Sequence, residues 1–282
     1  MNYKCFDVEI TDMVAQVRMI RPEKANSMIP EFWKELPEIV NDLSDQGEAR
    51  VIVISAEGRH FCSGMDLSVF DGDNSVTMGS SKFPSRTRAS FRSTALRLQR
   101  SFSCMEESRL PVLVAIQGAC VGGGIDMISA ADLRYATSDA YFCIAEINIG
   151  MTADVGTLQR MPKLVPEGVV RELAYTGRKM NAAEGKDRGF INEVFETHEE
   201  LLAAVNEVAK EIASKSPMAI WGTKQSMNFS RDHSVADGLE YIATWNASML
   251  DVDAIRSSYT AQAEGEKPQY DALLPVKKTA GE

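Results

Sequence analysis

Residues 117–156 read QGACVGGGIDMISAADLRYATSDAYFCIAEINIGMTADVG, and this stretch decides how the chain is interpreted. The apolar run at 112–116 precedes it and has the character of a buried strand. Glycines follow at positions 118 and 122–124, and residues 125–131 then have helical character. A strand, a glycine turn and a helix start place free backbone N–H groups at the positive end of a helix. The stretch therefore predicts a site for a phosphate or for an oxyanion that develops during a reaction.

Three carboxylates in or beside this stretch stand among apolar or small neighbours rather than in a charged run: Asp126, Glu146 and Asp154. Each has an ordinary structural explanation when it is taken singly. Asp126 suits the first turn of a helix because of the helix dipole, and Asp154 could cap a helix that begins at Val155. Taken together beside the glycines, the three acids predict proton carriers next to an anion site.

The stretch resembles the second signature of the crotonase (enoyl-CoA hydratase/isomerase) superfamily. Its continuation AEINIGMTADVGTLQRMPKLVP resembles the dienoyl-CoA isomerase branch, and EGRHFCSGMDL at 57–67 resembles the first crotonase signature. The resemblance covers roughly residues 6–262. It implies an α/β fold, with a crotonase-type core of repeated β-β-α units and a C-terminal helical trimerisation region.

The resemblance also implies how a thioester substrate is held. The backbone N–H groups of Met65 and Gly123 would form an oxyanion hole, in which loss of one donor typically costs ~3 kcal/mol in barrier. Coenzyme A would be the carrier, its adenine meeting the carbonyl of Ser63. Further residues expected to bind the substrate are Gly64, Asp66, Leu67, Lys24 and Arg59, with Arg21 as another candidate for the phosphates. The basic residues are chosen only for their charge near these loops.

The activity that the resemblance implies is isomerisation of 3,5-dienoyl-CoA to 2,4-dienoyl-CoA in fatty acid β-oxidation. This reaction removes a proton at C2 and delivers one at C6, through an enolate held in the oxyanion hole. By analogy with hydratases, Glu146 would serve C2 and Asp154 would serve C6, although the reverse assignment is open. Asp126 would hydrogen-bond to one of them and tune it.

The alternative activity is hydration of 2-enoyl-CoA. Asp126 and Glu146 align with the two glutamates that handle water in the hydratases. The first is shortened to Asp here, and Asp154 stands where those enzymes ordinarily have a glycine. Asp154 is therefore the residue that favours the isomerase over the hydratase.

Composition excludes several other classes. The chain has 282 residues and 44% apolar content, enough for a core, and its 30 basic against 40 acidic residues disfavour a nucleic-acid surface. It contains neither a GxxxxGK[ST] loop nor a GxGxxG pattern. Five widely spaced cysteines and three separate histidines predict no metal site, and no cofactor is expected besides the acyl-CoA substrate.

The expected partners are an acyl-CoA thioester and further copies of the chain, in a homotrimer or homohexamer. No apolar run approaches the roughly 20 residues of a membrane span. The start of the chain has no signal-peptide core, and its end is not a peroxisomal Ser-Lys-Leu address. We therefore expect a cytoplasmic protein that binds neither membranes nor nucleic acid.

Periodicity predicts the remaining elements. Residues 5–10 and 14–20 should form a hairpin that turns at Thr11-Asp12, and a helix at 30–45 should be kinked or split by Pro37. Residues 72–88 are polar and predict a mobile segment before a helix at 91–107. Four more helices are expected at 198–214, 217–229, 235–250 and 253–263.

These elements divide the chain into three parts. Residues 1–197 should form the crotonase core with the coenzyme A and acyl site. Residues 198–264 should form the helical oligomerisation region. The extension at 265–282 loses helical periodicity and contains two prolines, so it should pack loosely or on a neighbouring subunit.

Overall fold

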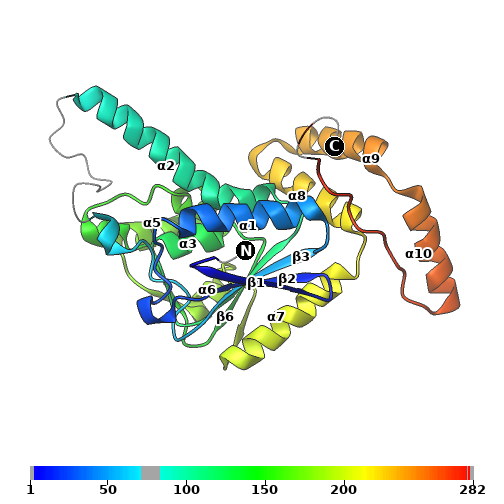
Figure 1. Ribbon diagram of the computed structural model, residues 1–282, viewed down its shortest axis with the longest axis horizontal. Helices are drawn as coiled ribbons and strands as arrows, with labels where there is room; N and C mark the ends of the chain where they lie inside the picture. The colour runs from blue at the N-terminus through cyan, green and yellow to red at the C-terminus, as the bar shows by residue number, and fades with distance from the viewer. Residues whose placement is uncertain (1–2, 71–82, 278, 280–282) are drawn as a thin grey trace.

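The computed structural model describes residues 3–70, 83–277 and 279 of the chain (Figure 1). Its main sheet has six strands in the order β1-β2-β3-β4-β6-β9. Their bounds are Phe6–Thr11, Val14–Met19, Val51–Ala56, Val112–Ile116, Leu133–Thr137 and Glu193–Phe195. Only the hairpin pair β1 and β2 is antiparallel within this sheet, whose other pairs are parallel. The hairpin turns at Asp12 and Met13, one residue later than predicted, and both have positive φ, as tight hairpin turns require.

A second sheet consists of three short strands. It contains β5 (Ala119–Val121), β7 (Tyr141–Cys143) and β8 (Met180–Asn181). Strand β5 follows β4 after two residues and leads directly into α3 (Gly123–Ser129), which repeats the order of β1, β2 and α1 (Phe32–Gln46). The repeated β-β-α units that the sequence predicts are therefore present.

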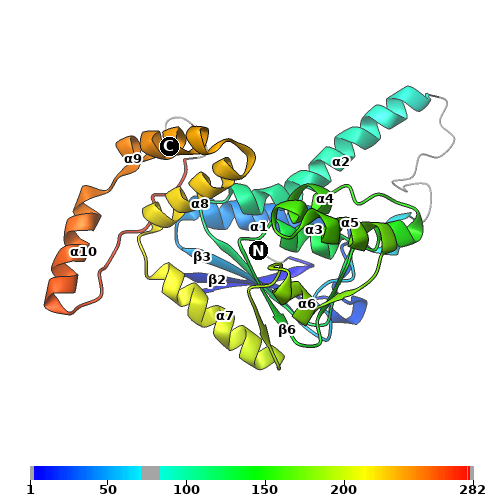
Figure 2. The same cartoon turned by 180° about the vertical axis from the view of Figure 1, so that it is seen from behind.

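Helices cover both faces of the main sheet, as Figures 1 and 2 show. Helices α1 and α2 (Pro84–Glu107) pack on one face, where Phe32 and Phe102 join the core residues Ile52 and Ile54. Helix α7 (His198–Ala213) packs on the other face, against the alternate side chains of the same strands. Strand β3 is buried at every position because both of its faces are covered.

Helix α1 runs through Pro37 without a break, so it is not split there. The alternative, a kink at Pro37, stays a prediction. Proline has no N–H to donate to the carbonyl four residues earlier, which belongs to Trp33. The hydroxyl of Ser101, on α2, donates to the Trp33 carbonyl at 2.9 Å instead. The neighbouring helix thus supplies the hydrogen bond that the proline removes.

Helix α2 begins at Pro84, earlier than predicted, and Figure 1 shows its first half projecting beyond the core. Residues 84–88 are therefore helical and not part of a mobile segment, while 71–82 lie outside the described residues. The buried positions of α2 are confined to its second half, at Ser101, Phe102, Cys104 and Met105.

Short elements complete the core. The helices α4, α5 and α6 span Thr157–Arg160, Glu167–Thr176 and Ala182–Asp187. Asn181 caps α6 by accepting a hydrogen bond from the N–H of Glu184. Single turns of 3-10 helix lie at Pro22–Lys24, Leu67–Phe70, Glu146–Ile149 and Met161–Lys163.

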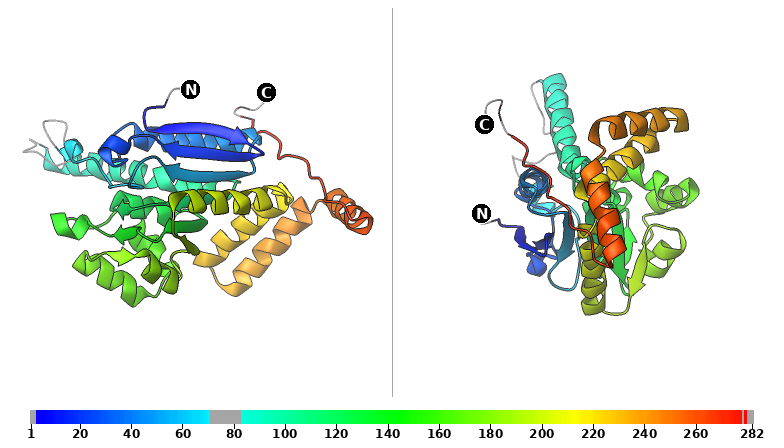
Figure 3. Two further views of the ribbon diagram at one scale, coloured as in Figure 1. Left: turned by 90° about the horizontal axis from the view of Figure 1, so that it is seen from below. Right: turned by 90° about the vertical axis from the view of Figure 1, so that its right-hand side faces the viewer.

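The last helices, α8 (Pro217–Asp232), α9 (Val235–Met249) and α10 (Val252–Glu264), extend away from the core (Figure 3). They follow the predicted bounds to within a few residues because Ser216, Ser234 and Asp251 cap their first turns. Buried Lys224 anchors α8, since its ammonium donates to the carbonyls of Met105 and Leu110 and to Asp132. No helix within the described ranges is both long and apolar enough to cross a membrane.

The segment after α10 returns to the core, so the expectation of loose packing is wrong. Arg50 and Arg109 donate to the carbonyls of Tyr270 and Leu274, and the N–H of Val276 donates to Asp45. The side chain of Leu273 is buried. Backbone groups of the tail are thus bonded to the chain's own first half.

Candidate active site

The two signature loops are in direct backbone contact. Gly64 has a φ of +87°, and a Cβ there would lie 2.9 Å from the carbonyl oxygen of Val121 and 3.4 Å from the nitrogen of Gly123. Cys62 and Cys120 pair as a parallel bridge, which fixes the register of the loops. Only glycine fits at position 64, because any side chain would separate the loops.

Two backbone N–H groups lie near each other at this contact. A Cβ built on Gly123 would lie 3.9 Å from the nitrogen of Met65. Gly123 is the first residue of α3, and within the described chain neither its N–H nor that of Met65 donates a hydrogen bond. The structure therefore brings the two predicted oxyanion donors together. Their role stays a prediction.

Asp126 lies in the first turn of α3, is 1% exposed, and is held by a neighbouring element. Its Oδ1 accepts a hydrogen bond of 2.6 Å from the backbone N–H of Thr157, the first residue of α4. Burial raises the pKa of Asp126 to about 6, although the Thr157 hydrogen bonds oppose that shift. No local pattern in the sequence predicts this link between α3 and α4.

Glu146 begins a 3-10 turn and is half-buried. A Cβ on Gly122 would lie 3.3 Å from Glu146 Oε1, so the carboxylate reaches the turn between β5 and α3. Its Oε2 is buried and finds no hydrogen-bond donor in the part of the chain that the structure describes. Burial, followed by the charge of Asp126, raises the pKa of Glu146 to about 7. A carboxylate with such a pKa suits proton exchange near neutral pH.

Asp154 lies at the outer side of the acid cluster. It is exposed, whereas its neighbours Ala153 and Val155 are buried. Partial desolvation by the surrounding chain still raises the pKa of Asp154 above its ordinary value. Asp154 does not cap a helix, because α4 starts at Thr157 with Gly156 as its N-cap residue and no side-chain cap. The predicted helix cap at Asp154 is therefore wrong.

The three acids interact through space. The charges of Asp126 and Asp154 each raise the pKa of Glu146, and the charge of Asp154 raises the pKa of Asp126. Three ionised carboxylates this close repel, so the group holds a proton more readily than isolated acids would. The predicted gathering of Asp126, Glu146 and Asp154 is present in the structure.

The predicted substrate-binding residues lie on the loops beside this cluster. Ser63 is exposed and its N–H donates to the carbonyl of Ala25. Lys24 and Arg59 are exposed, and neither forms an ion pair with a described residue. Leu67 starts a 3-10 turn, but its side chain lies outside what the structure describes.

Asp66 and Asn26 brace these loops. Asp66 accepts hydrogen bonds from the hydroxyls of Ser68 and Ser27, which lower its pKa to about 2. Asn26, which the sequence analysis missed, donates to the carbonyls of Glu57 and His60 from a left-handed conformation. An asparagine in a turn is the type of residue that adopts this conformation, and that is the signal that could have found it.

Comparisons with known proteins identify the family of the chain. A sequence model of the family described as enoyl-CoA hydratase/isomerase matches residues 9–272, so the chain belongs to that family. The chain is 40% identical to the mitochondrial Delta(3,5)-Delta(2,4)-dienoyl-CoA isomerase of Mus musculus, over 93% of this chain and 80% of that protein. It is 39% identical to the peroxisomal protein of the same name from Arabidopsis thaliana, over 90% of this chain and 91% of that protein.

Solved structures show the same fold. An enoyl-CoA hydratase from Bacillus anthracis superimposes with a TM-score of 0.85 at 25% identity, covering 95% of this chain and 99% of that one. A protein from Thermobifida fusca YX, crystallised with acetoacetyl-CoA, has a TM-score of 0.77 at 24% identity, covering 87% and 94%. The crotonase fold expected from the sequence is therefore confirmed.

Proposed function

We propose that this chain isomerises 3,5-dienoyl-CoA to 2,4-dienoyl-CoA, as a step in fatty acid β-oxidation. The observation that carries the proposal is a third carboxylate, Asp154, within electrostatic reach of Glu146 and Asp126. Beside these acids are two N–H groups that have no acceptor among the described residues. The names of the relatives from mouse and Arabidopsis support the same reaction.

The reaction proceeds through a dienolate. The thioester oxygen accepts hydrogen bonds from Met65 and Gly123, while Glu146 removes a proton from C2. The electron pair delocalises from C2 to C6 and onto the oxygen. Asp154 then delivers a proton to C6, which leaves double bonds at C2 and C4. One proton leaves the substrate and one enters, and the interacting acids redistribute the proton before the next turnover.

Hydration of 2-enoyl-CoA remains the second candidate, since Asp126 and Glu146 keep the spacing of a hydratase pair. Asp126 is 1% exposed and already accepts the Thr157 N–H, so it is poorly placed to activate a water. Assaying 3,5-dienoyl-CoA and 2-enoyl-CoA side by side tests the proposal. Faster turnover of the dienoyl substrate is expected, and hydration alone would refute it.

The substrate is held by its coenzyme A portion, and the chemistry requires no separate cofactor. Lys24 and Arg59 are better candidates for the phosphates than Arg21, whose guanidinium donates to the Ser27 carbonyl and pairs with Asp66 at 3.9 Å. Calorimetry with an acyl-CoA should show binding that weakens when Lys24 and Arg59 are changed to Met. Unchanged affinity in both variants would remove these two residues from the proposal.

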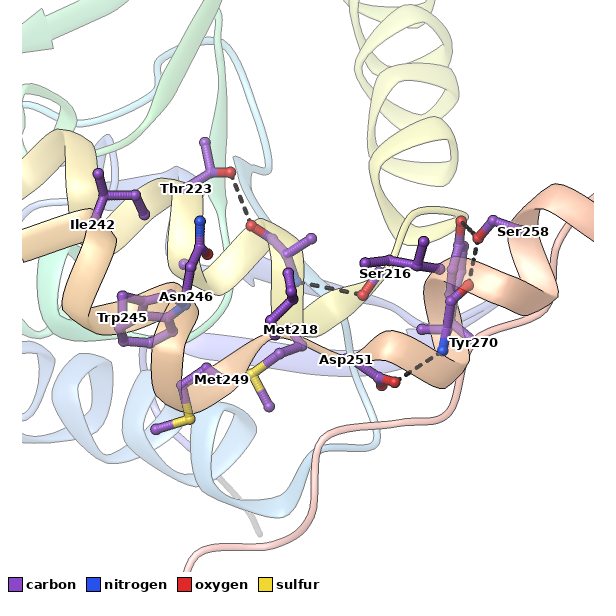
Figure 4. Close-up of a pocket in the computed structure, with 15 residues that line it drawn as sticks. Ser216, Met218, Thr223, Ile242, Trp245, Asn246, Met249, Asp251, Ser258 and Tyr270 are labelled. Carbon is purple, nitrogen blue, oxygen red and sulfur yellow. Dashed lines mark hydrogen bonds between the residues drawn. The ribbon is translucent and has the colours of Figure 1, made fainter. Parts of the chain in front are cut away.

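The same proposal includes self-association as a trimer or a dimer of trimers. Large apolar side chains on α8, α9 and α10 are exposed in the single chain, among them Met227, Val235, Leu239 and Tyr259. The pocket in Figure 4 lies between these helices and contains Met218, Trp245 and Met249, away from the three acids. Sedimentation should show an assembly of three or six chains, and a monomer at all concentrations would contradict this expectation.

The relatives from mouse and Arabidopsis are named as mitochondrial and peroxisomal proteins. Their names do not support the cytoplasmic location expected from the sequence, which stays a prediction. Fractionation of the source cells, followed by detection of this chain, would decide it.

A further inference from the structure

The main chain of the Asp154 loop is held by two side chains outside the acid cluster. Gln99, on α2, donates from Nε2 to the carbonyl oxygen of Asp154 at 2.8 Å. Arg160, on α4, donates from Nη1 to the next carbonyl, that of Val155, at 3.4 Å. Two successive peptide groups are thus bonded to helices on either side of the loop. The carboxylate of Asp154 is used in neither bond.

Arg160 is itself fixed by α2. Its Nε donates to Oε2 of Glu106 at 2.7 Å, and its Nη2 donates to the hydroxyl of Ser103 at 3.0 Å. The side chains of Arg160 and Glu106 are 12% and 15% exposed, so solvent screens this pair less than a surface pair. The other oxygen of Glu106 accepts from Arg231 on α8, at 2.6 Å. Glu106 therefore connects the loop to the C-terminal helices.

Gly156 completes the arrangement. Its φ is +139°, and a Cβ there would overlap the Nη1 atom of Arg160. The guanidinium therefore lies directly against the backbone of the loop, in a space that a side chain would fill. The loop that carries Asp154 is folded around Arg160.

We infer that Gln99, Arg160 and Glu106 are positioning residues, which set the place of the Asp154 carboxylate relative to the other end of the substrate diene. This inference rests on the proposed isomerase function. None of the three residues belongs to the acid cluster. Gln99 and Arg160 bond the backbone of the loop, and Glu106 fixes Arg160. The charge of Arg160 also lowers the pKa of Asp126, so Gln99 gives the cleaner test of positioning. A displacement of a catalytic group by about 1 Å can lower the rate about 100-fold. Losing a bond that positions the loop can therefore cost as much rate as losing a catalytic acid.

The test compares variants of the full-length assembly. Gln99→Met keeps the length of the side chain and removes the donor, and Arg160→Gln removes the ion pair with Glu106. Each should lower kcat for 3,5-dienoyl-CoA by about 10-fold to 100-fold while KM changes less than about 2-fold. Exchange of the C2 proton with solvent, assigned to Glu146, should persist. Arg100→Gln, at an exposed arginine of the same helix, is the matched control and should behave as the unaltered enzyme.

A double-mutant cycle separates positioning from a general structural effect. If Gln99 acts through Asp154, Gln99→Met should cause no further loss of kcat in an Asp154→Asn background. Additive losses, or normal kcat in both single variants, would overturn the inference. Gln99 is only half-buried on its helix, so Gln99→Met should fold. If Arg160→Gln fails to fold, Gln99→Met alone still tests the inference.

Amide hydrogen exchange distinguishes this inference from the proposed function. Peptides covering residues 153–160 should exchange faster in Gln99→Met than in Arg100→Gln, whatever reaction the enzyme performs. An unaltered enzyme that does not isomerise 3,5-dienoyl-CoA would refute the proposed function. Faster exchange in Gln99→Met would still support the positioning of the loop. Exchange in Gln99→Met that is no faster than in Arg100→Gln would count against it.

Discussion

The backbone N–H of Thr157 donates a hydrogen bond of 2.6 Å to Oδ1 of Asp126, which lies 31 residues earlier in the chain. The first N–H of a helix has no partner within its own helix, so it needs one from elsewhere. Here a buried carboxylate supplies it, and α4 is thereby fixed to α3. Asp126 is consequently held in place while Glu146 keeps an oxygen without a donor among the described residues.

Asp126 should make the fold less stable as pH rises. Its pKa in the folded state is raised to about 6 from an ordinary 3.8, so the folded chain binds this proton more tightly than the unfolded chain does. The contribution of Asp126 to stability is therefore greatest below about pH 4 and is lost as the pH rises towards about 6. Asp126→Asn keeps an acceptor for Thr157 and should raise the free energy of unfolding by roughly 3 kcal/mol at pH 8.

Denaturant titrations at pH 8 and pH 4 check this expectation. The difference between Asp126→Asn and the unaltered chain should vanish at the lower pH. Asp187→Asn, at an exposed carboxylate of α6, serves as control and should show little effect at either pH. Equal stabilisation of Asp126→Asn at both pH values would contradict the linkage argument.

The rate of isomerisation should fall on the acidic side of neutrality. In the proposed mechanism Glu146 must be ionised to remove the C2 proton. Its pKa is raised to about 7, first by burial and then by the charge of Asp126. Asp126→Asn removes that charge, so the acidic limb of kcat/KM should move to lower pH. A profile that is flat between pH 5 and pH 8 would exclude Glu146 as the base.

Asp154→Asn should abolish isomerisation, by at least the ~100-fold typical of a lost acid/base group. Binding of an acyl-CoA, measured by calorimetry, should change little, because the proposal places the carrier at the loops around Ser63. Asp253→Asn, at an exposed carboxylate on α10, is the control. Full activity in Asp154→Asn would remove the main reason to prefer the isomerase to the hydratase.

Gly122→Ala should reduce activity by displacing Glu146. Gly122 has a φ of +53°, and a Cβ there would lie 3.3 Å from Glu146 Oε1. Both the strain and the contact oppose the substitution. Gly168→Ala is a suitable comparison, because a Cβ at Gly168 meets nothing within 4 Å. Steady-state kinetics should show a loss of kcat only in the first variant, and equal losses in both would contradict the proposed contact.

Lys224→Met should destabilise the attachment of α8. The ammonium of Lys224 satisfies two carbonyls and the carboxylate of Asp132, all of which lose a donor in the variant. Because Asp132 is partly exposed, the cost should be about 2–3 kcal/mol rather than that of a fully buried pair. Lys215→Met, at an exposed position, should cost little. Thermal unfolding measures the loss of stability in both variants. Equal losses would argue against Lys224 as the residue that attaches α8 to the core.

Local signals made much of the molecule predictable from sequence. The C-terminal helices follow their apolar periodicity and their Ser and Asp caps, and the glycines at 64 and 122–124 mark the close approach of two backbones. These features depend on residues a few positions apart.

Interactions between distant segments could not be predicted in this way. The continuity of α1 at Pro37 depends on Ser101, and the docked tail depends on an arginine 220 residues away from Tyr270. The partner of Asp126 is likewise a main-chain group on another helix. Neither periodicity nor composition carries information about such pairs.

The docked tail turns the C-terminal helices into a closed loop. The chain leaves the core after α7, and Arg50 holds both the carbonyl of Ala213 at that exit and the carbonyl of Tyr270 at the return. The entropy lost on closing a loop grows only with the logarithm of the loop's length. A few hydrogen bonds and the buried side chain of Leu273 are therefore enough to stabilise a long closed loop. The side chain of Arg50 thus bonds the chain just before α8 and again after α10. The positions of the three helices relative to the core are limited at both ends.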